Sequence, residues 1–140
     1  MADQTTQHTR GWFLTVMTVL FLLLALSDFT KAFQFARNPT HLGLVVFGHR
    51  FYGVAHNLIL GPLFGVVLLF YAFGIWNLRK WVLPLSMVYA FYVPYNLVLF
   101  WYSQPPGPRP IGPIVGYLAI ALTGSIGTAI YLAYNRARLN

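Results

Sequence analysis

Long hydrophobic runs separated by short polar segments dominate this chain. Four of the runs are about twenty residues long, the length that an α-helix needs to cross the hydrocarbon core of a bilayer. They predict an all-α fold, an integral membrane antiparallel four-helix bundle that occupies residues 1–140 as a single domain. The predicted spans cover about residues 12–33, 50–76, 81–102 and 114–134.

Proline and glycine refine the predicted spans. Pro62 and Pro94 lie inside the second and third spans, where proline removes a backbone donor, so we expect a kink at each. Gly61 and Gly65 are four residues apart and leave a narrow helix face, which favours the close approach of a neighbouring helix. The connection at residues 77–80 is so short that the second and third spans should form an antiparallel hairpin.

Composition supports a membrane location. The chain is 58% hydrophobic and only 8% charged, too few charges for the surface of a soluble domain of this size. The net charge of +7 comes from basic residues at the ends of the hydrophobic runs, where they meet lipid headgroups. We therefore expect membrane lipids as partners and no nucleic acid. A slight excess of these residues on the side of the termini predicts that both termini are cytoplasmic.

The few polar residues within the runs form a second pattern. Because consecutive spans alternate in direction, the segments that carry these residues meet on the side of the membrane away from the termini. With about 1.5 Å of rise per residue, the polar residues fall within a layer roughly 10 Å thick. We expect this layer to form an intramembrane pocket whose candidate ligand-binding residues are Asp28, His56, Asn57, Tyr92, Tyr95, Asn96 and Tyr117.

Asp28 is the one acidic residue outside the N-terminal tail, and two interpretations of it stay open. It forms a structural ion pair with Lys31 or Arg50 near the headgroups, or it contacts a ligand or transfers a proton together with His56. His49 and His56 lie on one predicted helix, so they cannot clamp one haem iron from opposite sides. The absence of cysteine excludes thiolate sites. We predict no metal, no cofactor and no catalytic residue.

Several features of the chain resemble a known family. They are the acid of ALSDF at residues 25–29, the segment GPLFGVVLLFYAFGIWNLRKWVLPLSMVYA at 61–90, and Pro94. This pattern resembles the EXPERA domain of four-span membrane proteins, which includes sterol isomerases and the sigma-2 receptor, and small bacterial DoxX-like proteins are similar. The resemblance implies a cavity for sterol-like or cationic amphiphilic molecules, with Asp28 as its acidic residue. The family's second acid, near the position of His56 or Asn57, is missing, which argues against isomerase chemistry.

These observations lead to three hypotheses about function. The first is non-enzymatic binding of a small hydrophobic or lipid-like ligand in the intramembrane polar pocket. The alternative is an accessory or structural subunit of a larger membrane complex, with glycine-rich and aromatic faces packed against partner proteins. A lipid-modifying, isomerase-type enzyme is a second alternative. The first hypothesis predicts a cavity at the polar layer, and the second predicts a filled bundle with an apolar interface to other chains.

Overall fold

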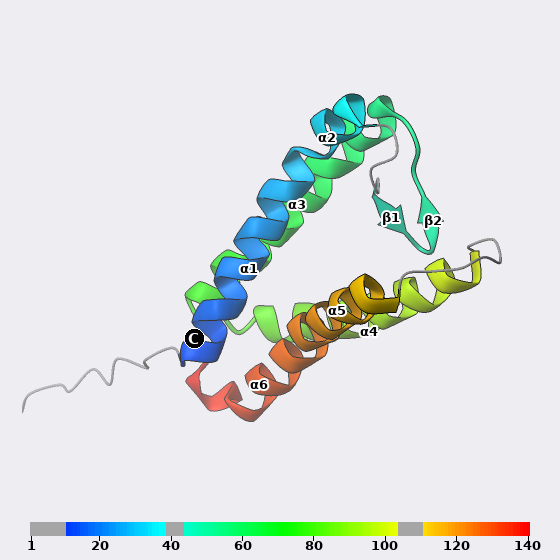
Figure 1. The fold of residues 1–140 in the computed structure, drawn as a ribbon. Helices are drawn as coiled ribbons and strands as arrows, with labels where there is room; N and C mark the ends of the chain where they lie inside the picture. The colour runs from blue at the N-terminus through cyan, green and yellow to red at the C-terminus, as the bar shows by residue number, and fades with distance from the viewer. Residues whose placement is uncertain (1–10, 39–43, 104–110) are drawn as a thin grey trace, which may run out of the picture.

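The computed structural model describes residues 11–38, 44–103 and 111–140, without the side chains of 111–114 and 117. Within these ranges the chain is predominantly helical, with one short β-hairpin (Figure 1). The elements in chain order are α1 (Trp12–Phe29), α2 (Lys31–Arg37), β1 (Val45–Val46), β2 (His49–Arg50), α3 (Val54–Trp76), α4 (Val82–Ser103), α5 (Ile111–Leu122), the π-helix η1 (Thr123–Gly127), α6 (Thr128–Tyr134) and the 3₁₀-helix η2 (Arg136–Arg138).

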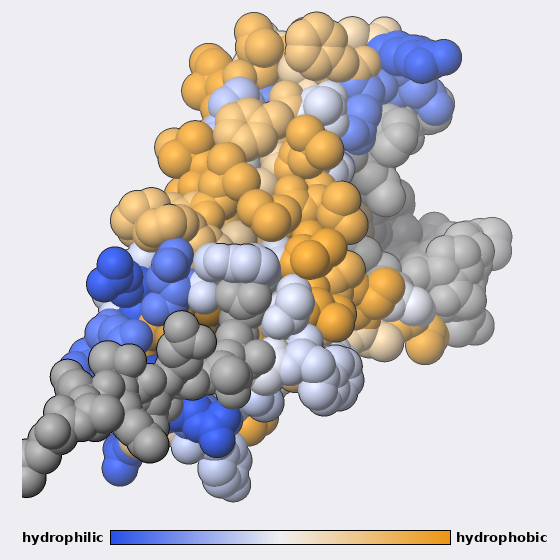
Figure 2. Space-filling model, turned by 90° about the vertical axis from the view of Figure 1, so that its left-hand side faces the viewer, coloured by the Kyte–Doolittle hydropathy of each residue, from blue (hydrophilic) through white to orange (hydrophobic). Residues whose placement is uncertain are grey.

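Three helices, α1, α3 and α4, are long and apolar enough to cross a membrane. A shorter apolar helix covers Leu118–Tyr134. Figure 2 shows a hydrophobic band on one face of the molecule, with hydrophilic residues gathered at its two ends. Length, composition and surface pattern are thus those of a multi-pass membrane protein, as the sequence predicts.

The helices form two antiparallel pairs. One pair is α1 with α3, and the other is α4 with α5, η1 and α6 (Figure 1). The pairs meet at the end of the molecule that holds the α3–α4 turn, which we call the vertex, and they diverge toward the opposite, open end. Within each pair the helices are antiparallel, but α3 and α4 diverge from their common turn instead of forming the predicted antiparallel hairpin (Figure 1). The described helices therefore do not close into the expected four-helix bundle.

Helix boundaries also differ from the predicted spans. The first helix ends at Phe29 rather than near residue 33, and the short α2 follows after Thr30. The Thr30 hydroxyl donates to the carbonyl oxygens of Leu26 and Ser27, at 3.1 Å and 3.0 Å, and so satisfies backbone groups at the end of α1. The second predicted span begins four residues later than expected, at Val54, because residues 45–50 form the hairpin.

Small residues allow α1 and α3 to approach closely, as predicted. A Cβ atom on Gly65 would lie 2.8 Å from the Phe29 ring. A Cβ atom on Gly61 would meet the backbone carbonyl oxygen of Asp28, which cannot move aside without distorting α1. Both glycines are therefore required for this helix contact. Close packing of this kind matters in a bilayer, because the hydrophobic effect does not drive helices together when lipid tails surround them.

Aromatic and leucine side chains fill the region between the pairs near the vertex. The rings of Phe21, Tyr71 and Tyr89 contact one another across α1, α3 and α4, with centroids 4.9–5.9 Å apart. Phe13 of α1 stacks on Tyr131 of α6 at 5.1 Å. Such aromatic pairs add to the area that they bury, so this packing holds the two pairs together at one end.

Gly61→Ala should destabilise the protein by about 1–3 kcal/mol, because the added methyl group overpacks the α1–α3 contact against backbone. Thermal or denaturant unfolding in detergent micelles measures the change. Gly116→Ala in α5 is the matched control, since no atom lies within 4 Å of the new Cβ. Equal stability of the two variants would contradict this packing of α1 on α3.

Candidate functional site

The polar residues of the open end gather around a β-hairpin. Strands β1 and β2 pair antiparallel, with Val45 opposite Arg50 and Val46 opposite His49. The hairpin lies between the diverging ends of α3 and α4 (Figure 1). With strands of two residues each, it satisfies only part of its own backbone, and the remaining groups need other partners.

Asn57 of α3 binds the base of the hairpin. Its side chain is fully buried, and its Oδ1 accepts a hydrogen bond from the Leu44 amide at 3.0 Å. Its Nδ2 donates to the carbonyl oxygens of Phe51, at 3.1 Å, and Gly53, at 2.8 Å. One side-chain amide therefore satisfies backbone groups before and after the hairpin and ties both to the start of α3.

Asn96 of α4 binds the other end of the hairpin. Its Oδ1 accepts from the Gly48 amide at 2.8 Å, and its Nδ2 donates to the Val45 carbonyl oxygen at 3.2 Å. The Phe47 ring meets Tyr92 edge-on, with centroids 5.5 Å apart. The hairpin is thus bound to both helix pairs, and we call residues 44–51 the strap.

The turn of the strap is shaped for contact with α4. Phe47 and Gly48 have φ angles of 48° and 76°, in the left-handed region that two-residue hairpin turns commonly use. A Cβ atom on Gly48 would lie 2.5 Å from Leu99 Cβ, so only glycine allows the strap backbone to rest on the helix. A phenylalanine in this region costs about 1–2 kcal/mol. The contact of its ring with Tyr92 offsets part of that cost.

Asp28 lies apart from the strap. Its side chain is 9% exposed and lies at the end of α1, where α1 packs against Gly61 of α3. Lys31, one turn further on, attracts it electrostatically. Within the described residues, no hydrogen bond or direct ion pair joins Asp28 to Arg50 or His56. The structural ion pair and the proton-transfer pair both stay predictions.

The remaining predicted site residues occupy different surroundings. His56 is exposed, with its ring 5.9 Å from that of Phe51, and Tyr95 is also exposed. The side chain of Tyr117 lies outside the described part of the chain. The structure therefore brings together Asn57, Tyr92 and Asn96 and leaves the other candidates separate. Within the same described residues, no group of three or more potential metal ligands gathers.

The structure also contains an apolar groove that sequence reasoning missed. It lies between α4 and the η1–α6 segment and has a volume of about 470 Å³. Small and large apolar side chains line it, including Ala90 and Phe91 of α4 and Ala129, Ile130, Ala133 and Tyr134 of α6. The signal in the sequence was the pair Ala129 and Ala133, four residues apart on one helix face, which leaves room beside α4.

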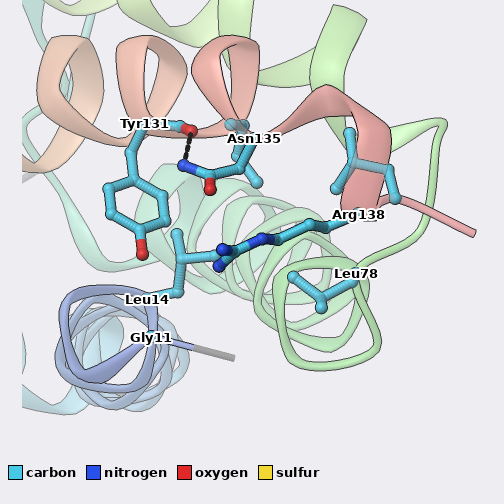
Figure 3. Close-up of a pocket in the computed structure, with 8 residues that line it drawn as sticks. Gly11, Leu14, Leu78, Tyr131, Asn135 and Arg138 are labelled. Atoms are coloured by element: carbon cyan, nitrogen blue, oxygen red, sulfur yellow. Dashed lines mark hydrogen bonds between the residues drawn. The ribbon is translucent and has the colours of Figure 1, made fainter. Parts of the chain in front are cut away.

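A second pocket lies at the vertex (Figure 3). Its volume is only about 10 Å³, which is room for one water molecule at most. Tyr131 and Asn135 line it, and the Asn135 Nδ2 donates to the Tyr131 carbonyl oxygen at 2.9 Å. This pocket is a packing defect between α1 and α6 rather than a site for an organic ligand.

Comparison with protein-family models, with curated proteins and with solved structures finds no match for this chain. The resemblance to EXPERA-domain proteins stays a prediction, and so does the sterol cavity that it implies. The two features with defined geometry are the strap, bound by Asn57 and Asn96, and the groove between α4 and α6.

Asn96→Leu should release the strap from α4. The substitution leaves the Gly48 amide and the Val45 carbonyl without their partner, at a cost of about 1–3 kcal/mol for each group that stays buried. Hydrogen exchange of the Gly48 amide should become at least tenfold faster, because a loss of about 1.4 kcal/mol in the free energy that protects the amide is enough for a tenfold change. Tyr95→Leu is the control, because Tyr95 is the adjacent exposed residue on α4. Unchanged exchange in Asn96→Leu would show that these hydrogen bonds do not hold the strap.

Proposed function

We propose that this protein is a four-span membrane protein that binds a lipid-like ligand by its acyl chain in the groove between α4 and α6. The observation that carries the proposal is the groove itself, whose volume of about 470 Å³ falls in the range of small-molecule sites. In this arrangement α5, η1 and α6 together form the fourth span, antiparallel to α4. No catalytic role is part of the proposal.

The chemistry of the groove favours an apolar chain as its occupant. All the residues that line it are apolar or aromatic, and the one polar group among them is the Tyr134 hydroxyl at the end of α6. A polar ligand would lose its hydrogen bonds to water in such a groove without gaining replacements. An acyl chain has no such cost, and its methylene groups can fill the space beside Ala90 and Ala129.

Charge supports an orientation for this proposal. The vertex holds basic residues of the α3–α4 turn and of η2, and the start of α1 and the end of η2 lie on that side. Basic residues close to the ends of membrane spans favour the cytoplasmic side. We therefore place the vertex, and both termini with it, at the cytoplasmic face of the membrane.

The divergence of the helix pairs favours a second candidate function, that of a subunit in a larger membrane complex. Helices α3 and α4 are in contact near their common turn and separate toward the open end (Figure 1). A helix of a partner protein that packed between them would find apolar faces on both sides. Purification in mild detergent distinguishes the two functions, because a stoichiometric protein partner supports the second.

Ala90→Leu should fill part of the groove and lower the amount of phospholipid that stays bound through purification in mild detergent. Mass spectrometry of lipid extracts measures this amount, and we expect at least a threefold decrease. Val88→Phe is the matched control, because Val88 is 65% exposed on the same helix and does not line the groove.

Both variants must keep the thermal unfolding midpoint of the unmodified protein for this comparison to count. Ala133→Leu, which fills the groove from α6, provides a second variant if Ala90→Leu is unstable. Equal lipid retention in the groove-filling and control variants would rule out the groove as the binding site.

A further inference from the structure

A cluster of cations forms at the vertex from two distant parts of the sequence. The turn between α3 and α4 contributes Arg79 and Lys80, and η2 contributes Arg136 and Arg138. All of these side chains are exposed. The chain contains only two acidic residues, of which Asp3 lies outside the described residues and Asp28 lies near the open end. No acidic side chain of the described residues lies at the vertex.

Backbone hydrogen bonds hold the two basic segments together. The Asn140 amide donates to the Leu78 carbonyl oxygen, and the Lys80 amide donates to the backbone oxygen of Asn140, both at 2.7 Å. Leu139 is 5% exposed and lies in the same apolar cluster as Leu78. A specific contact of the folded chain thus brings the two basic segments together. Their proximity is more than the usual presence of basic residues at the ends of separate membrane spans.

The cluster adjoins the groove between α4 and α6. Tyr134 lines the groove, is the last residue of α6 and is followed two residues later by Arg136. On the α4 side, Lys80 lies in the turn two residues before α4 begins at Val82, and Met87 is the first residue of α4 that lines the groove. Arg138 extends instead across the small vertex pocket toward Leu14 (Figure 3). Arg136 and Lys80 are therefore the vertex cations that the chain connects most directly to the groove residues Tyr134 and Met87.

We infer that the lipid held in the groove is an anionic phospholipid whose headgroup binds Arg136 and Lys80. This inference rests on the proposed function, because it assumes an acyl chain in the groove. A chain that lies between α4 and α6 brings its phosphate to the vertex end, next to these two residues. A cation near a membrane surface contributes about a fivefold preference for an anionic over a zwitterionic lipid, and the contribution falls with salt.

The test is a competition between two lipids. The full chain is equilibrated in detergent with equal amounts of phosphatidylglycerol and phosphatidylcholine of identical acyl chains, and bound lipids are counted by native mass spectrometry. We expect phosphatidylglycerol to predominate. Arg136→Gln should lower its preference about fivefold, and addition of Lys80→Gln should lower it further. Arg37→Gln is the matched control, because Arg37 is an exposed arginine of α2 at the open end.

Separate outcomes test the inference and the proposed function. An equal decrease in Arg37→Gln and Arg136→Gln would overturn the inference, because it would show unspecific attraction of headgroups to any exposed cation. If Ala90→Leu abolishes lipid retention while Arg136→Gln leaves the lipid ratio unchanged, the groove binds lipid without selecting anionic headgroups. If Ala90→Leu retains phosphatidylglycerol fully, the proposed groove is wrong, and so is the placement of the headgroup at its end.

Discussion

The need to satisfy backbone polar groups governs the open end of this protein. A short hairpin lies between the diverging ends of α3 and α4 (Figure 1), and strands of two residues leave backbone groups that need partners outside the hairpin. The side-chain amides of Asn57 and Asn96 supply those partners, because an amide offers a donor and an acceptor in the same geometry as a peptide group. The strap, and through it the contact between the diverging pairs, depends on these two residues.

The two ends of the molecule are therefore held by different forces. At the vertex, aromatic rings and leucines pack between the two helix pairs, and a backbone hydrogen bond joins Asn140 to Leu78. At the open end, directional hydrogen bonds from Asn57 and Asn96 add to packing contacts such as that of Phe47 with Tyr92. Dispersion contacts tolerate small shifts between helices, whereas a hydrogen bond weakens steeply with misalignment. The strap thus defines the relative position of α3 and α4 more sharply than apolar contact alone could.

Sequence patterns predicted the long apolar helices. The length of the hydrophobic runs predicted α1, α3 and α4. The spacing of Gly61 and Gly65 predicted that a neighbouring helix packs closely on α3, and this helix is α1. Asn57 and Asn96 both lie at the open end, but their partners are backbone groups of the strap, which side-chain patterns do not report. Two-residue strands are too short for a periodic signal. The divergence of the pairs stayed hidden because these helices are apolar on every side, so no amphipathic stripe indicated which faces pack together.

Because these helices are apolar on every side, a lipid site in such a protein must depend on the shape of the helix surface and on charge at the ends of the site. Inside a bilayer, an apolar side chain gains little by exchanging a lipid tail for another helix, so hydrophobicity cannot distinguish a binding face from any other. Side-chain size can distinguish a binding face, because small residues such as Ala90 and Ala129 leave a groove where larger side chains would fill the space. Headgroup charge is the second feature that distinguishes one lipid from another, because basic side chains bind anionic headgroups at the membrane surface, outside the hydrocarbon core. In the proposed site, a groove between small residues whose lining includes Tyr134, two residues before Arg136, combines both features in one place.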